Sequence, residues 1–317
     1  MTQGATIEPS RPLHDEYRRK RSVLEQTRRR AVILFLLLPS SIGVIGLFLL
    51  PVIAVLFISF TKWDLFAPPS FVGWGNYKTI FADGHFVHSL LVTAYYVLLA
   101  VPLQVAVSLG LAVLVNRSLP GTGFVKVLWV LPWLATPVAM AVVWTWFFDP
   151  DPHFGVVNAL LGLLGVTGPA WLSSSNLALP VIAATHIWQH AGYSMLFFIA
   201  GLSSIPKQLY ESAAVDGASG IQQFFRITLP LLNPTMLFVL VTGVIGSFQV
   251  FDTVYVLTGG GPGQSTKVAN IAIYQEAFTS FHFGQGAAMS VIMFLVILLF
   301  TGVQFAFFRN RTTYEMV

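Results

Sequence analysis

The sequence contains no cysteine, which excludes disulfide bonds, thiolate metal sites and a cysteine nucleophile. It is also poor in charge, because Asp, Glu, Lys and Arg together make up 9% of the chain. Hydrophobic residues account for 55%, and the mean hydropathy is +0.74. An ordinary soluble domain needs a far more charged surface than this composition can supply. The composition therefore predicts a polytopic membrane protein.

Six apolar stretches are long enough for membrane-spanning helices, since a bilayer core of ~30 Å needs about 20 apolar residues per helix. We predict an all-α fold whose spans cover residues 31–60, 89–115, 127–148, 180–203, 234–257 and 287–308. The first stretch is long for a single helix. Pro39 and Pro51 leave open whether it forms one helix or two.

The basic residues lie mainly on one side of these spans. Fourteen of the 17 fall in the N-terminal segment, the second and fourth loops and the tail: Arg11, Arg18, Arg19, Lys20, Arg21, Arg28, Arg29, Arg30, Arg117, Lys126, Lys207, Arg226, Arg309 and Arg311. The other side has only Lys62, Lys78 and Lys267. The positive-inside rule then places both termini in the cytoplasm of a cell whose plasma membrane holds the chain.

This topology divides the chain into three parts. Residues 1–30 form a basic cytoplasmic segment, residues 31–308 a transmembrane domain with a cytoplasmic loop at 204–233, and residues 309–317 a cytoplasmic tail. We interpret the basic N-terminal cluster as a topology signal that also attracts anionic lipid headgroups, and not as a nucleic-acid site.

Two loop segments resemble binding sites only superficially. The run Gly259–Gly263 is rich in glycine, but the chain has no Gly-Lys-Ser or Gly-Lys-Thr and so no P-loop. Any energy from ATP must then come through a separate chain, and we expect no cofactor here. Asp149, Asp151 and His153 have no recognised spacing of metal ligands, so we predict no metal site.

The cytoplasmic segment 206–230 has the pattern of two short amphipathic helices. Pro206 suits the first position of a helix, Gly217 suits its left-handed stop, and Pro230 is expected to end the second helix. Ser219 and Gln222 have the spacing of a capping box. One face of the second helix is expected to carry Ile221, Phe224, Phe225 and Thr228.

Such a helix pair forms a knob suited to a partner protein. Ala213 and Ala214 allow close backbone approach, and Glu211 and Asp216 offer carboxylates to basic residues. A pair of interfacial helices without a partner has the same pattern. The residues alone leave both interpretations open.

Polar side chains inside two spans predict a path for a hydroxylated solute. His186, Gln189, His190 and Tyr193 share one face of the fourth span, and Trp133, Trp144 and Trp188 offer rings for stacking. The fifth span carries the group that we favour as the path: Ser247, Gln249, Asp252 and Tyr255. Hydrogen bonding between helices is the alternative role for these residues.

The knob also carries a recognisable signature. Glu211-Ser212-Ala213, Gly217 and Ile227-x-Leu229-Pro230 match the spacing E-A-A-x-x-x-G-x9-I-x-L-P, with Ser212 in place of the first alanine. The chain thereby resembles the permease subunits of bacterial binding-protein-dependent ABC importers. Three further segments are similar to the carbohydrate branch of that family: FVGWGNY at 71–77, LPWLATPVAMAVVWTWFF at 131–148 and VFDTVYVLTGGGPGQST at 250–266.

The resemblance implies a Type I importer fold and a set of partners. A second, similar permease subunit, two ATPase subunits that bind ATP and Mg²⁺, and an extracytoplasmic sugar-binding protein would complete the machine. Residues 206–230 would be the coupling helices, with Glu211 as the polar contact and Gly217 as the corner. In this interpretation the chain is no enzyme and moves a di- or oligosaccharide, amino sugar or related polyol.

A proton-coupled secondary sugar transporter is the alternative function. It would use Asp252 with a histidine as a proton relay, but we detect no internal repeat and few carboxylates within the spans. A channel filter and a paired acid and base are also missing from the sequence. The particular sugar is not encoded in any of these patterns.

Overall fold

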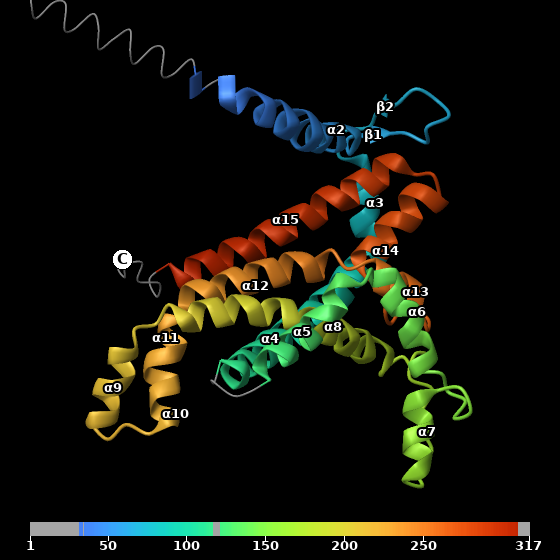
Figure 1. Cartoon of the computed structure of the whole chain (residues 1–317). Helices are drawn as coiled ribbons and strands as arrows, with labels where there is room; N and C mark the ends of the chain where they lie inside the picture. Colours follow the sequence, from blue (N-terminus) through green and yellow to red (C-terminus); the bar gives the residue numbers. More distant parts are fainter. Residues whose placement is uncertain (1–31, 34, 117–120, 310–317) are drawn as a thin grey trace, which may run out of the picture. The chain divides into compact units, whose positions relative to one another are not determined.

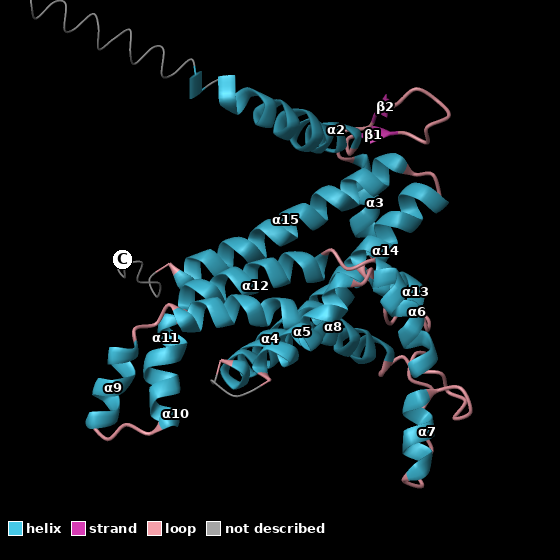
Figure 2. Ribbon diagram, viewed as in Figure 1, coloured by secondary structure: helices cyan, strands magenta, loops and turns pink. Residues whose placement is uncertain are grey.

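The computed structural model describes residues 32–33, 35–116 and 121–309. The predicted basic segment 1–30 and all of the tail beyond Arg309 lie outside the described residues. The chain divides into two compact units, residues 1–57 and 58–317, which are described separately. Figure 2 shows helices throughout the described chain, with one small antiparallel hairpin.

The described part of the first unit is a single apolar helix. It spans Phe35–Ile58, and its last segment, α2 (Leu50–Ile58), follows a π-helical turn at Ile45–Leu49. The helix passes through both Pro39 and Pro51, so residues 35–58 of the first predicted stretch form one helix. In the wide turn the Leu50 amide donates to the Ile45 carbonyl. This turn comes just before Pro51, whose missing N–H would otherwise interrupt a regular α-helix.

The second unit contains the remaining elements in a simple order. The hairpin pairs Thr61 with Phe71 and Lys62 with Ser70. Its strands and the helices that follow are β1 (Thr61–Lys62), β2 (Ser70–Phe71), α3 (Gly75–Asp83), α4 (His85–Val115), α5 (Thr122–Leu134), α6 (Pro137–Phe147), α7 (Val156–Leu163), α8 (Ala178–Ser203), α9 (Lys207–Val215), α10 (Gly220–Gln223), α11 (Leu229–Leu231), α12 (Asn233–Phe248), α13 (Asp252–Leu257), α14 (Ala269–Tyr274) and α15 (Phe283–Phe308).

The core of this unit forms around α4 and α8. These two helices have the most extensive contact, α5 packs on α8, and α12 packs on both α4 and α15. Tyr96, Ile182 and Phe198 are fully buried between them. One buried hydrogen bond, from Gln104 Nε2 to Ser194 Oγ at 2.9 Å, joins α4 to α8. Apolar packing and a few satisfied polar groups thus hold the unit together.

The third predicted span, 127–148, is wrong as a single helix. It consists of α5 and α6, which meet at an angle of 100°. Thr136 caps α6 through its side chain, and Pro137 occupies the first turn. A proline at this position favours the start of a new helix over continuation of the old one.

The fifth predicted span, 234–257, is also interrupted. Helix α12 ends at Phe248, and α13 begins at Asp252 after a three-residue break. Helices α13 and α6 pack against each other. The second parts of the two broken spans therefore form a pair.

Length and hydropathy support several crossings of a membrane. Three described helices qualify alone, Phe35–Ile58, His85–Val115 and Phe283–Phe308, and up to five spans result if the pair α5 with α6 and the pair of residues 220–231 with α12 each count as one. Helix α8 has 26 residues, or ~39 Å at 1.5 Å per residue. His186, Gln189 and His190 lower the hydropathy of α8, so the fourth predicted span is not among those counted.

Within the second unit, the loops of interest lie at opposite ends of the long helices. Figure 1 shows α9 and α10 beyond the end of α8, near the last turns of α15. The hairpin lies by the first turn of α15, where the Gly284 amide donates to the Trp63 carbonyl at 3.4 Å. The 204–233 loop and the hairpin therefore lie at opposite ends of the second unit.

Candidate functional site

The first helix of the knob, α9, ends in a glycine-dependent motif. Gly217 has φ +79°, which is the left-handed conformation that glycine adopts without strain. The Ala218 amide donates to the Ala213 carbonyl at 2.9 Å, and the Gly217 amide donates to the Ala214 carbonyl at 3.0 Å. These two bonds form a Schellman motif. The predicted stop at Gly217 is confirmed, while Pro206 lies one position earlier than expected, as the N-cap.

The second helix begins as its sequence predicts. The Ser219 amide donates to Gln222 Oε1 at 2.8 Å, and the Gln222 amide donates to Ser219 Oγ at 3.4 Å. The capping box is therefore present on both sides. It fixes the point at which the chain turns from the α9 stop into α10.

The predicted end of this helix at Pro230 is wrong. Pro230 lies inside α11, and the helical path continues to Leu231 before a bend of 67° into α12. A π-helical turn at Phe224–Thr228 precedes the proline, and the Leu229 amide donates to the Phe224 carbonyl across it. The wider turn accommodates the amide that Pro230 lacks, as the turn before Pro51 does in the first unit.

One hydrogen bond joins the two helices of the knob. Tyr210 Oη and Thr228 Oγ1 lie 2.9 Å apart, with Thr228 buried. The predicted apolar face of the second helix is only partly covered. Thr228 is buried and Phe224 is half-buried, whereas Ile221 and Phe225 are 73% and 61% exposed. The two helices thus form one rigid, largely exposed knob.

The residues of the signature lie mostly on the surface of this knob. Glu211 and Asp216 form no ion pair among the described residues. Val215 is 89% exposed beside them. Of the residues predicted to contact an ATPase, the exposed ones are Glu211, Ala214, Asp216, Gly217 and Pro230, and the half-buried ones are Ala213, Ile227 and Leu229.

The candidate path residues of the fifth span lie around the break between α12 and α13. Ser247 is fully buried, so its hydroxyl faces the protein interior. Gln249, Asp252 and Tyr255 are exposed, and the Tyr255 side chain is 50% exposed. The break explains why the structure separates Ser247 from the other three, which a continuous helix would have placed close to one side.

In the fourth span, Gln189 and Tyr193 contact the bent third span. Gln189 is buried, and its Nε2 donates to the Ala135 carbonyl at 3.2 Å, where α5 gives way to α6. The Tyr193 ring stacks on Trp133 with centroids 4.3 Å apart and planes at 9°. Gly192 lies so close to the Trp129 carbonyl that a Cβ atom would overlap it. The sequence pattern identified this face of α8, but it did not indicate that these residues contact the bend between α5 and α6.

Among the described residues, no three His, Cys, Asp or Glu side chains are grouped closely enough to hold a metal ion. Two of the three side chains considered in the 149–153 loop accept hydrogen bonds from backbone amides. Asp149 Oδ1 accepts from the Asp151 amide and Asp151 Oδ1 from the His153 amide, both at 2.9 Å. These contacts build a turn.

Comparison with known proteins identifies the chain. Residues 18–313 match the family described as the binding-protein-dependent transport system inner membrane component. The chain belongs to this family. It is therefore a membrane subunit of a transport system and not an enzyme, and the permease predicted from the signature is confirmed.

Several relatives match over most of their length. The probable ABC transporter permease YesP of Bacillus subtilis (strain 168) is 38% identical, with 84% of this chain and 87% of the relative covered. The sulfoquinovosyl glycerol transport permease SmoG of Agrobacterium fabrum (strain C58 / ATCC 33970) is 35% identical, with coverage of 89% and 92%. The sn-glycerol-3-phosphate transport permease UgpA of Brucella abortus biovar 1 (strain 9-941) is 32% identical, with coverage of 89% and 96%.

A solved structure supports the fold. A chain from a bacterial ABC transporter that imports the acidic polysaccharide alginate superimposes with a TM-score of 0.80, at 24% identity, with 92% of this chain and 100% of that chain covered. The all-α polytopic fold of a Type I importer permease is thereby confirmed. The two interrupted spans of this chain were not visible in its hydropathy pattern.

Proposed function

We propose that the chain is the membrane-spanning permease subunit of an ATP-driven importer that moves a sugar across the bacterial plasma membrane by alternating access. The rigid, exposed knob of α9 to α11 carries this proposal, because it displays the family signature on a surface that has no use in a self-contained transporter. The names of the relatives SmoG and UgpA, which refer to sugar-derived or glycerol-derived solutes, support the substrate class.

In this proposal the knob transmits force from an ATPase. Glu211 and Asp216 supply carboxylates for basic residues of the partner, and the Schellman motif at Gly217 keeps the angle between the two helices fixed. A rigid knob converts the closure of two ATPase subunits into movement of the helices attached to it, α8 and α12. ATP and Mg²⁺ are bound by the partner subunits, since this chain has no P-loop sequence.

The solute path in this proposal runs past the break between α12 and α13. Discontinuous helices often line transporter sites because their unpaired backbone groups and side chains meet the solute there. Gln249, Asp252 and Tyr255 are exposed at this break. Gln189 and Tyr193 contribute by shaping the bend of α5 and α6, and the buried Ser247 does not reach the path. A di- or oligosaccharide, amino sugar or related polyol fits this mixture of amide, carboxylate and ring.

The assembly completes the path. A second, homologous permease would face the exposed surface around α13, a sugar-binding protein would deliver the solute on the outer side, and two ATPase subunits would hold the knobs. The charge asymmetry of the loops supports cytoplasmic termini and a cytoplasmic knob.

The test uses vesicles that contain the whole complex with the loaded binding protein outside. We expect uptake to require ATP inside, on the side of the knob, and to survive an uncoupler. ATP supplied only outside should have no effect, which tests the orientation as well. Uptake that continues without ATP and collapses with the proton gradient would instead support the secondary transporter.

A further inference from the structure

A row of five aromatic rings connects the break after α12 with the outer hairpin. We call Tyr255, Tyr274, Phe278, Phe283 and Trp63 the aromatic row. Successive ring centroids lie 5.8, 5.6, 5.6 and 6.2 Å apart. Tyr255, Tyr274 and Phe278 are 50%, 37% and 58% exposed. Trp63 and Phe283 are half-buried, so three rings of the row keep exposed surface that a ligand can contact.

The backbone places these rings in line. Tyr274 and Phe278 are four residues apart through a π-helical turn, Gln275–Thr279, so their side chains lie on the same side. Phe281, with φ +59°, turns the chain into α15 at Phe283. The Gly284 amide then joins the start of α15 to the Trp63 carbonyl. The row follows one continuous surface of the second unit.

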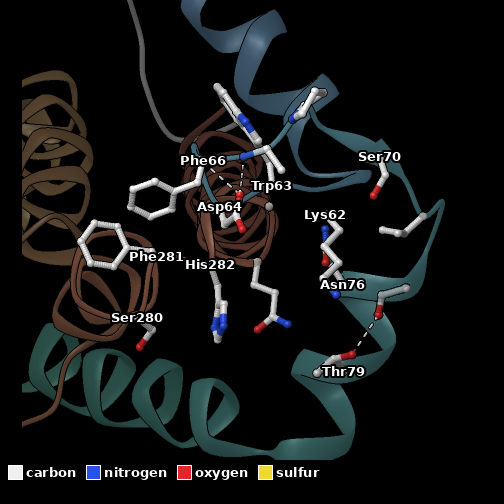
Figure 3. Close-up of a pocket in the computed structure, with 16 residues that line it drawn as sticks. Lys62, Trp63, Asp64, Phe66, Ser70, Asn76, Thr79, Ser280, Phe281 and His282 are labelled. Atoms are coloured by element: carbon white, nitrogen blue, oxygen red, sulfur yellow. Dashed lines mark hydrogen bonds between the residues drawn. The ribbon is translucent and has the colours of Figure 1, made fainter.

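The outer end of the row opens into a cavity of about 860 Å³. Figure 3 shows Lys62, Asn76 and Thr79 on one side of it and Phe281 and His282 on the other. Hydrogen-bonding groups and rings therefore surround one space. Such a mixture suits a saccharide, whose hydroxyl edges need polar partners and whose ring faces stack on aromatic side chains.

Three contacts keep the walls of this cavity in place. His282 Nδ1 lies 2.7 Å from Glu276 Oε1, which orients the imidazole. Asp64 Oδ1 accepts the amides of Ala67 and Phe66, both at 3.1 Å. The Ala67 amide is the main cause that lowers the pKa of the Asp64 carboxyl, and the Phe66 amide adds to it. The Asp64 carboxylate therefore remains charged at neutral pH.

Two residues with strained backbone conformations lie in or next to the wall of the cavity. Leu65 and Phe281 have positive φ values of +67° and +59°, and they are the two non-glycine residues with this conformation in the described chain. One belongs to the hairpin loop between cavity-lining residues, and the other is itself a lining residue on the opposite wall. Residues held in such conformations concentrate at ligand sites.

We propose that this outer cavity is an entry subsite for a saccharide, and that the aromatic row leads the sugar from it to Gln249 and Asp252. This inference rests on the proposed function as a sugar importer and adds a first contact and a route to it. Neighbouring rings lie close enough for a sugar to move its apolar face from one ring to the next. Polar groups at both ends, and rings between them, let the solute move without a deep intermediate energy well.

The first experiment replaces rings of the row without removing apolar volume. Tyr274→Leu and Phe278→Leu are compared with Phe294→Leu, which changes an exposed ring of α15 outside the row. The whole complex is reconstituted with its binding protein, loaded with whichever of maltose, chitobiose or digalacturonate that protein binds. We expect each row variant to lower uptake about two- to tenfold, the usual value of one aromatic contact.

The control readout is ATP hydrolysis stimulated by the loaded binding protein. Because the row acts on the sugar and not on the knob, stimulation should stay at the wild-type level, so that less sugar enters per ATP. The Phe294 control should change neither quantity. Equal uptake in all variants would overturn the proposal, and so would a parallel loss of uptake and stimulation, which indicates a structural role.

A second experiment uses Phe278→Cys, which introduces a single cysteine into the cysteine-free chain. The proposal predicts that the loaded binding protein slows labelling by an impermeant thiol reagent and that the empty protein does not. Protection that needs only the second permease would make the row a subunit interface and overturn the proposal. If the wild-type complex imports no saccharide, the proposed function itself fails, whereas wild-type uptake with unaffected variants refutes only the row.

Discussion

At the scale of single residues, Gln189 shows how a polar side chain inside the membrane can serve the fold. The periodicity of α8 placed it with His186 and Tyr193 on one face, and the solute path was the natural interpretation. The structure brings its amide to the Ala135 carbonyl at the bend between α5 and α6, which is the hydrogen bonding between helices that the sequence left open as the alternative role. That carbonyl sits where one helix has ended and the next is capped by Thr136. The bend leaves the Ala135 carbonyl to be satisfied by a side chain, and Gln189 supplies the donor.

Gln189→Leu tests this role. The substitution keeps the size of the side chain but leaves the Ala135 carbonyl without its donor, which costs about 1 kcal/mol. We expect the melting temperature of the purified complex to fall by a few degrees. Gln249→Leu is the matched control, because Gln249 is exposed, and it should leave the melting temperature unchanged. Loss of uptake by Gln189→Leu at an unchanged melting temperature would assign the side chain to the solute path.

At the scale of elements, the sequence predicted what local chemistry determines. The capping box at Ser219 and the glycine stop at Gly217 depend on a few neighbouring residues, and both occur as expected. The effects of Pro51 and Pro230 were not predictable in this way. Each follows a π-helical turn that removes the clash, and a wide turn leaves no clear mark in hydropathy. The break at Thr136 has a local signal in the Thr136 cap and Pro137, which hydropathy does not register. The break at residues 249–251 has no proline or glycine to mark it.

The contact between α5 and α8 gives a prediction about an element. Gly192→Ala would drive a methyl group into the Trp129 carbonyl, so α5 must move away from α8. Overpacking of this kind costs about 1–3 kcal/mol or more. We expect less folded protein in the membrane and a lower melting temperature. Gly110→Ala on α4 has open space around its Cβ position and should be neutral or slightly stabilising. Equal behaviour of the two variants would show that the helices do not pack this closely.

At the scale of the whole molecule, the two proposed tasks, coupling to an ATPase and contact with the sugar, belong to different ends of the second unit. The knob lies by the last turns of α15, and the hairpin with its cavity lies by the first turn (Figure 1). Helices α4, α8, α12 and α15 connect these ends through a packed core. Movement of the knob can therefore reach the broken spans α6 and α13, which pack on each other, without any large rearrangement of local structure. Composition alone indicated the membrane, but only the packing shows this connection.

The central claim is that the knob couples the permease to an ATPase, and one measurement tests it most directly. ATP hydrolysis by the reconstituted complex is followed with and without sugar-loaded binding protein for Glu211→Lys and Gly217→Pro, with Gln208→Lys on an exposed position of the same helix as control. The lysine reverses a contact charge, and proline is incompatible with the left-handed corner. We predict that both variants insert and pair with the second permease but lose the stimulation about tenfold or more, as expected for a lost charged contact. Wild-type stimulation and uptake in both variants would contradict the account.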